Sequence, residues 1–138
     1  MTKVNTILAK ETSFVAMSYV PQLNMVHVEV LPEESAMNKV AKGMPLYKVF
    51  AELIQADTID IIDLTDDLCV IVDDEGLLKS GNLVYELELQ GTKVQIAGRF
   101  AFGRNYFCEN HGLKTIPLTP FDYVILKDLD VEIIGQVR

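Results

Sequence analysis

Cys108 and His111 stand three residues apart, a spacing that zinc ligands often have. A structural zinc site needs four ligands, and the other soft ligands of the chain are Cys69, inside an apolar run, and His27. A site bridging a symmetric dimer would supply two cysteines and two histidines. A nucleophilic Cys108 with His111 as its base would also need an oxyanion-stabilising group, and no segment marks one. We therefore expect a loop cysteine beside a surface histidine, with no metal, no cofactor and no catalytic residue.

The carboxylates of Asp73, Asp74 and Glu75, followed by Gly76, are oxygen ligands of the type that calcium prefers. An EF-hand loop carries its carboxylates at alternate positions, with glycine at the sixth position and glutamate at the twelfth. The run does not fit that frame, so it predicts a solvated turn in which Gly76 has a positive φ. The sequence also contains no Walker-type phosphate loop and no dinucleotide-binding fingerprint.

A cluster of basic and aromatic residues lies further along the chain, and such clusters stack on bases or nucleotides. Phe100 and Phe102 belong to a predicted strand, where core packing accounts for them. The remaining members are the candidate ligand-binding residues for a small anionic, nucleotide-like molecule, with a protein contact as the other interpretation of the same side chains. They are Arg99, Arg104, Tyr106 and Phe107.

The charge of the chain is strongly segregated. The formal net charge is −8 and the isoelectric point about 4.6, so nucleic acid and anionic membranes are poor partners. Residues 52–88 hold 11 acids and one base, Lys79, whereas residues 89–120 have a local charge of +3. The acidic block is interpreted either as a solubilising surface or as a patch for a basic protein partner. The candidate partner-binding residues are Asp57, Asp60, Asp63, Asp66 and Asp67.

The elements that position these residues can be read from periodicity. Residues 45–56 predict a helix, because an apolar stripe recurs at helical spacing after Pro45. The β-branched runs 59–64 and 68–72 predict strands, the second covered on both faces. Residues 83–102 predict a hairpin, with its turn at Gln90-Gly91 and Glu88 opposite Lys93, since only this register keeps the apolar faces together.

The remaining segments complete an α+β fold. Strands are predicted over residues 13–20, 26–31 and 131–134, and helices over 33–42 and 119–129, the latter with a capping box from Thr119 to Asp122. We expect a mainly antiparallel sheet of about five strands with two helices, 45–56 and 119–129, packed on one face. The 138 residues predict a single domain, in which residues 1–24 form an N-terminal extension or an extra hairpin strand.

Residues 46 to about 103 resemble a small uncharacterised domain of proteins from bacteriophages, conjugative elements and Gram-positive bacteria. The matching segments are LYKVFAELI, IDIID, CVIV followed by DDEGLLKSGN, and VQIAGRF. DDEGLLKSGN, residues 73–82, is the most specific of them. The resemblance implies a mobile-element accessory protein and an expected fold, but no catalytic residues. Such proteins often act by binding a host component.

Three hypotheses of function follow. The first is a non-enzymatic interaction protein that binds a host protein through a surface patch. One form of this hypothesis has the protein act as a homodimer. The second is a binding module for a small anionic ligand. The third and weakest is an enzyme, because no acid–base pair or nucleophile arrangement stands out. No apolar run approaches 18 residues and no secretory signal is visible, so we expect a cytoplasmic protein.

Overall fold

The computed structural model describes residues 2–3, 13–20, 25–108, 112–116 and 118–138. Within them the chain forms ten strands, three α-helices and one 3-10 turn. In chain order these are β1 (Thr2–Lys3), β2 (Ser13–Val20), β3 (Met25–Pro32), α1 (Glu33–Ala41), α2 (Leu46–Ile54), β4 (Ile59–Asp63), β5 (Leu68–Asp73), η1 (Gly76–Leu78), β6 (Leu83–Leu89), β7 (Thr92–Ala97), β8 (Phe100–Cys108), β9 (Gly112–Ile116), α3 (Pro120–Leu126) and β10 (Asp130–Gln136).

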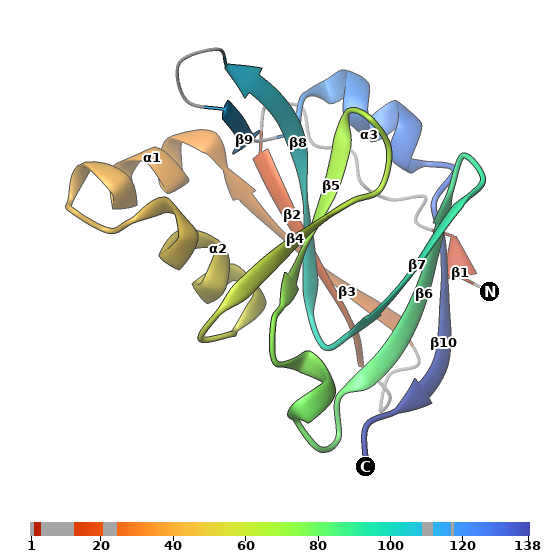
Figure 1. Cartoon of the computed structure of the whole chain (residues 1–138). Helices are drawn as coiled ribbons and strands as arrows, with labels where there is room; N and C mark the ends of the chain where they lie inside the picture. The colour runs from red at the N-terminus through yellow and green to blue at the C-terminus, as the bar shows by residue number, and fades with distance from the viewer. Residues whose placement is uncertain (1, 4–12, 21–24, 109–111, 117) are drawn as a thin grey trace.

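The strands form two antiparallel sheets (Figure 1). The first has four strands in the order β1-β10-β6-β7, and the second has six, in the order β3-β2-β8-β5-β4 with β9 paired to β8. The predicted α+β class and the antiparallel pairing are confirmed. The strands are divided between two sheets, however, where the sequence predicts one sheet of about five strands.

The change of sheet occurs at Gly98. The sequence predicts one continuous strand up to residue 102, and this prediction is wrong: β7 ends at Ala97 in the first sheet, and β8 begins at Phe100 in the second. Gly98 has a φ of +87°, and a Cβ there would lie 2.9 Å from Nδ2 of Asn82. Since an L side chain strains this backbone conformation, glycine makes the corner between the sheets.

The register of the β6–β7 hairpin is confirmed. Glu88 lies opposite Lys93, and Tyr85 lies opposite Ile96. The two-residue turn has positive φ at both positions, 51° at Gln90 and 82° at Gly91, which is the type I′ geometry that matches strand twist.

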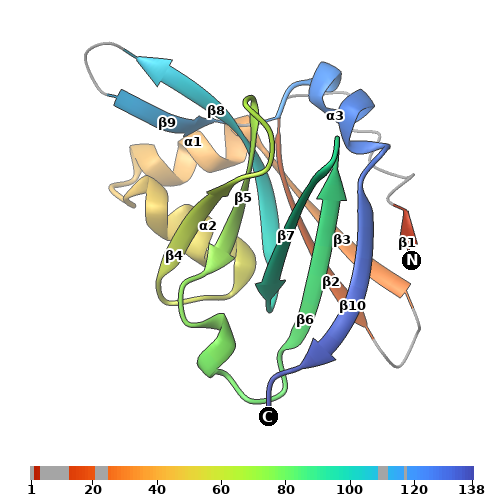
Figure 2. The same cartoon turned by 45° about the vertical axis from the view of Figure 1, so that its right-hand side comes forward.

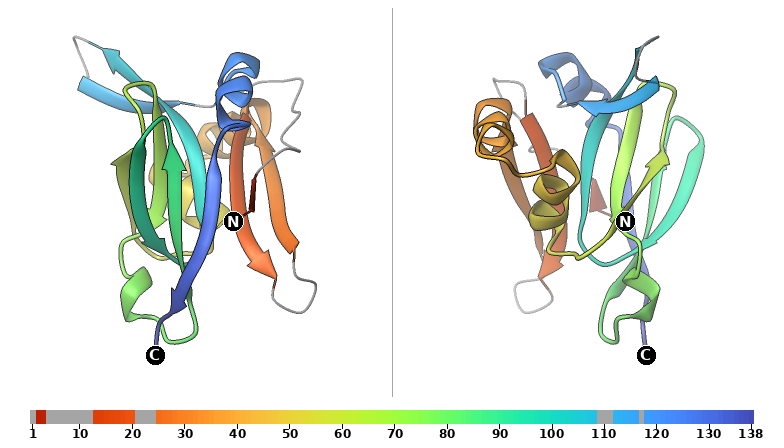
Figure 3. Two further views of the ribbon diagram at one scale, coloured as in Figure 1. Left: turned by 90° about the vertical axis from the view of Figure 1, so that its right-hand side faces the viewer. Right: turned by 60° about the vertical axis from the view of Figure 1, so that its left-hand side comes forward.

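The main core lies between the two sheets. Tyr85 and Phe102 each make an edge-to-face contact with Phe100, with ring centroids 5.3 and 5.6 Å apart. α3 adds the fully buried Leu126 to the same core. Helix α3 therefore packs with the inter-sheet core, at one end of the sheets in Figure 3.

A second apolar cluster joins α1 and α2 to the other face of the six-stranded sheet. Val49, Leu53 and other stripe residues of α2 pack against Ile71 of β5 and Ala101 of β8. Figure 2 shows both helices on one side of β4 and β5, with β6, β7 and β10 on the other. The face predicted to carry two helices does so, but its second helix is α1, while the helix predicted over 119–129 lies elsewhere and ends at Leu126.

Among the described residues, no helix has the length and apolar character needed to cross a membrane.

Candidate functional site

The segment DDEGLLKSGN, residues 73–82, forms a hydrogen-bonded turn that contains η1; we call it the η1 turn. The carboxylate of Asp73 accepts a hydrogen bond from the backbone N–H of Glu75 at 2.9 Å and another from Nζ of Lys79 at 2.5 Å. The bond to Asp73 raises the pKa of Lys79 above 10.5. Nδ2 of Asn82 donates to the carbonyl of Gly76 at 3.0 Å. Both ends of the turn are therefore fixed by side chains of the turn itself.

The η1 turn is also fixed to the segment that follows β10, close to the C-terminus in Figure 3. The N–H of Gly81 donates to the carbonyl of Val137, and the N–H of Val137 donates to the carbonyl of Asn82, both at 2.8 Å. Nε2 of Gln136 donates to the carbonyl of Gly81 at 3.0 Å. These bonds restrict the conformation of the turn.

Gly76 is buried in this turn, and the positive φ predicted for it is wrong. The glycines with positive φ among the described residues are Gly43, Gly81, Gly91 and Gly98. Gly76 begins η1 and packs against β7, where a Cβ would lie 2.3 Å from the carbonyl oxygen of Ala97. Close backbone approach, not backbone conformation, requires glycine at this position.

The η1 turn presents two large apolar side chains to solvent. Leu77 is 71% exposed and Leu78 is 81% exposed, the highest values among the large hydrophobic side chains of the described residues. Single exposed leucines are common on protein surfaces, but this pair lies on a conformationally fixed turn and beside a groove. Together these features are typical of a recognition surface.

Two hollows lie between β7 and the β4–β5 hairpin, and we call them together the β4–β7 groove. The larger, a cavity of about 530 Å³, is lined by Asp60, Ile62, Val72, Asp73, Asp74, Gly76, Leu77, Leu78, Val84, Gln95, Ile96 and Ala97. The smaller, about 320 Å³, is lined by Asp63, Leu64, Thr65, Asp66, Thr92 and Asn105. The η1 turn forms one end of this groove.

The lining of the groove combines apolar and acidic side chains. Ile62, Val72 and Ile96 contribute apolar surface to the larger hollow, and Asp63 and Asp66 line the smaller one. No Lys or Arg among the described residues lines either hollow. Of the acids that line the groove, Asp73 forms an ion pair with the ammonium group of Lys79. The groove therefore favours a ligand with apolar and positively charged groups.

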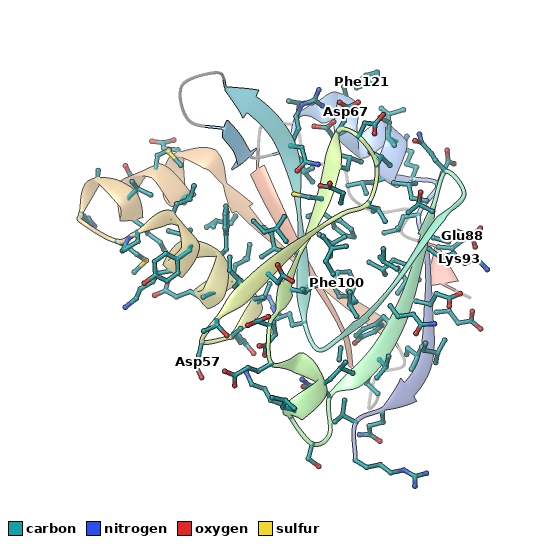
Figure 4. All side chains as sticks on the ribbon, viewed as in Figure 1. Asp57, Asp67, Glu88, Lys93, Phe100 and Phe121 are labelled. Atoms are coloured by element: carbon teal, nitrogen blue, oxygen red, sulfur yellow. The ribbon has the colours of Figure 1, made fainter. Side chains whose placement is uncertain are left out.

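The five predicted partner-binding acids are all exposed and follow β4, the edge strand of the six-stranded sheet. Asp60 and Asp63 belong to the strand, Asp57 precedes it, and Asp66 and Asp67 lie in the turn to β5. Figure 4 shows Asp57 and Asp67 at opposite ends of the hairpin. The structure thus spreads these acids along one edge, and Asp60, Asp63 and Asp66 line the groove.

The two predicted anion-binding arginines are not brought together. Nε of Arg99 donates to the carbonyl of Leu53 at the end of α2, at 2.8 Å. Nη1 of Arg104 contacts Oδ1 of Asp122 at 2.5 Å. Each guanidinium is thereby engaged with a different helix. Tyr106 and Phe107 belong to β8 and pair with β9, and their side chains lie outside the described residues.

Asp122 confirms the predicted cap of the helix that begins at Pro120. Its Oδ2 accepts hydrogen bonds from the backbone N–H of Thr119 at 2.8 Å and from the Thr119 hydroxyl at 2.9 Å. The Asp122 side chain is fully buried. Arg104, which contacts the same carboxylate, thus has a structural partner that the sequence pattern did not connect to it.

The candidate metal ligands are only partly described. Cys69 is buried in β5, while the side chain of Cys108 and all of His111 lie outside the described residues, as does the side chain of His27. Within the described part of the chain, no group of three or more His, Cys, Asp or Glu side chains could hold a metal ion.

Comparisons with known proteins find no match: no family model, no curated protein and no solved structure matches this chain. The sequence pattern missed the exposed Leu77–Leu78 pair, because two adjacent leucines after Gly76 look like core residues.

Proposed function

We propose that this chain is a non-enzymatic interaction protein that binds a basic, partly apolar surface of another protein through the η1 turn and the β4–β7 groove. The observation that carries the proposal is the exposure of Leu77 and Leu78, 71% and 81%, on a turn fixed by hydrogen bonds beside the groove. A rigid surface loses little conformational entropy on binding, and apolar side chains that fill a partner's pocket supply much of the energy of an interface.

Charge supports a basic partner. Asp57, Asp60, Asp63, Asp66 and Asp67 form no salt bridge with any residue of the described part of the chain. Their uncompensated field accelerates the approach of a positively charged partner and slows that of an acidic one. The resemblance to domains of bacteriophages and conjugative elements supports a host protein as that partner.

The small-anion hypothesis finds less support. A phosphate site needs cationic groups that converge on one point. Arg99 and Arg104 instead face Leu53 and Asp122, on different helices.

The test is affinity capture from host lysate, with bound proteins identified by mass spectrometry. The variant replaces Leu77 and Leu78 together by serine. The matched control replaces Phe121 and Val124 of α3 by serine, a second exposed apolar pair at 68% and 57% exposure. The proposal expects a captured protein that is lost with the first variant and retained with the control. Equal capture by the wild type and the Leu77→Ser, Leu78→Ser variant refutes it.

A further inference from the structure

β7 forms one edge of the four-stranded sheet, and its backbone faces the β4–β7 groove. The N–H of Gly98 donates to the carbonyl of Leu83 at 2.9 Å. This bond identifies which residues of β7 form hydrogen bonds with β6. In an antiparallel pair, every second residue directs both its N–H and its C=O toward the neighbouring strand. Residues 92, 94 and 96 therefore bond to β6, and Lys93, Gln95 and Ala97 direct their peptide groups away from it.

The η1 turn limits how much of this edge is open. The carbonyl of Ala97 is in close contact with Gly76, where no Cβ would fit. Lys93 and Gln95 remain, and they offer two N–H and two C=O groups to an incoming strand. The Lys93 ammonium lies 3.8 and 3.9 Å from the carboxylates of Glu86 and Glu88, on the sheet surface, and so does not place its charge on the groove side.

The opposite side of the groove is formed by β4, the edge strand of the six-stranded sheet. The N–H of Asp74 donates to the carbonyl of Thr58, and the N–H of Leu64 donates to the carbonyl of Leu68. These two bonds identify which residues of β4 form hydrogen bonds with β5. By the same rule, Ile61 directs its N–H away from β5. That N–H donates to Oδ1 of Asp60 at 2.8 Å. A charged side chain that occupies an edge amide blocks strand addition, so the centre of the β4 edge is capped, whereas no described strand pairs with the outer edge of β7.

We infer that the open edge of β7 accepts an extended segment of the partner as an additional antiparallel or parallel strand, with apolar residues in its middle and Lys or Arg toward its ends. This inference rests on the proposed function and names the form of the segment that is recognised. Backbone pairing to Lys93 and Gln95 supplies affinity, and side chains supply specificity. The apolar residues meet Ile62, Val72 and Ile96, and the basic residues meet the acids that line the two hollows.

The distances along the groove fit a short strand. β7 extends from Thr92 to Ala97, and the stretch before Ala97 that the η1 turn leaves open, residues 92–96, is about 14 Å long at a rise of about 3.4 Å per residue. The middle of a peptide of about eight residues covers this stretch, and its terminal residues do not need to pair with β7. The ends of such a peptide come beside Asp60 and Asp74 in one hollow and beside Asp63 and Asp66 in the other.

The experiment measures binding of fluorescent peptides of about this length by anisotropy, with the full chain. The first probe alternates Val and Thr between terminal Arg pairs, and the second has Glu in place of Arg. The inference expects binding of the Arg peptide, weakening as salt increases, and at least about tenfold weaker binding of the Glu peptide. Equal binding of both, or no binding of the Arg peptide, overturns it.

The protein variant that tests backbone pairing is Gln95→Pro. Proline removes the N–H that faces the groove and leaves the bonds to β6 in place, and it is tolerated at an edge strand whose N–H faces outward. The matched control is Gln95→Ala, because both variants lose the side-chain bond to Glu86, 3.1 Å. We expect Gln95→Pro to weaken binding of the Arg peptide by about tenfold or more and Gln95→Ala by less than about threefold. Equal affinities of the two variants overturn the inference.

A second measurement leaves the protein unchanged, in case Gln95→Pro does not fold. Two versions of the Arg peptide carry N-methyl groups at complementary sets of alternate residues. If the peptide pairs only with β7, one version should lose binding and the other should keep it, because only every second N–H group of the peptide points toward β7. Loss with both, or with neither, overturns pairing to a single edge.

These outcomes separate the inference from the proposed function. If Leu77→Ser, Leu78→Ser loses capture but the Arg peptide does not bind, the proposed function is supported and the inferred strand addition is overturned. Sedimentation addresses a second copy as the occupant. If the wild type dimerises and Gln95→Pro is monomeric, the edge is occupied by another copy of this acidic chain, and the inferred basic segment is overturned.

Discussion

Gly76→Ala tests whether the η1 turn is fixed by its close contact with β7. The Cβ would lie 2.3 Å from the carbonyl oxygen of Ala97, about 1 Å closer than an ordinary contact allows. Overpacking of this kind typically costs about 1–3 kcal/mol. The carbonyl of Gly76 also accepts bonds from Asn82 Nδ2 at 3.0 Å and from Lys79 N at 3.4 Å, and weakening both adds about 1 kcal/mol. We therefore expect unfolding free energy to fall by about 2–4 kcal/mol.

Urea denaturation followed by circular dichroism measures this loss, provided that the slope of the transition does not change. For 138 residues, the expected loss corresponds to a decrease in Tm of about 7–14 °C. Gly81→Ala is the matched control: its φ is +92° and no atom lies within 4 Å of an added Cβ, so only backbone strain of about 1–2 kcal/mol applies. A loss below about 1 kcal/mol in Gly76→Ala refutes the close-contact argument.

Three further predictions concern the core, the acidic edge and the η1 turn. Leu53→Ala is expected to cost about 2–5 kcal/mol in urea denaturation, because Leu53 is 5% exposed between α2 and the sheet; a loss under about 0.5 kcal/mol contradicts this packing. Replacing Asp63, Asp66 and Asp67 together by Asn is expected to slow association with the captured partner, most at low salt, and unchanged rates would leave these acids with a solubilising role. The raised pKa of Lys79 means that its charged form stabilises the fold below pH 10.5 and that this contribution disappears as the pH rises through the raised value. The stability difference between the wild type and Lys79→Gln should therefore shrink above pH 10.5, and a difference that stays constant in alkaline urea titrations would contradict the assignment.

Elements defined by local patterns were predictable from the sequence. The helical spacing of the apolar stripe gave α2, with Val49, Phe50 and Leu53 buried as expected. The faces of β6 and β7 admit only one register, and the two-residue turn follows from it. The cap of α3 depends on Thr119 and Asp122, three residues apart, and is likewise a local signal.

The arrangement of the sheets was not predictable, because it depends on contacts between distant residues. A glycine within an apolar run indicates a bulge or a close approach, but nothing near Gly98 reveals that Asn82 approaches it and that the chain changes sheet there. Gly76 shows the same limit. The sequence pattern assigns it the positive φ of a turn glycine, whereas the neighbour that requires a glycine is Ala97, 21 positions further along the chain.

The candidate site was predicted only in part, because the rest of it again depends on contacts between distant residues. Acidic residues at the ends of a short strand indicate an exposed edge, and the five aspartates of β4 and its turns lie along one. The complementary groove requires β7 from the other sheet, and its position follows from the corner at Gly98. Leu77 and Leu78 resemble core residues in the sequence, and only the packing of Gly76 beneath them shows why they face solvent.

The distribution of charge connects the fold to the choice of partner. In the positively charged segment, Arg99 binds the end of α2, Arg104 binds the buried Asp122, and Lys93 lies near two glutamates. These cations are occupied by the protein's own acceptors, so they offer little attraction to an external anion. The acids along β4 accept hydrogen bonds from Ile61 N–H and Asn105 Nδ2, but they form no ion pair with a Lys or Arg of the described residues. Because exposed charges that remain uncompensated act mainly on association rate and partner choice, the net charge of −8 favours a basic partner over an acidic one, and the groove beside those acids is where we propose that such a partner binds.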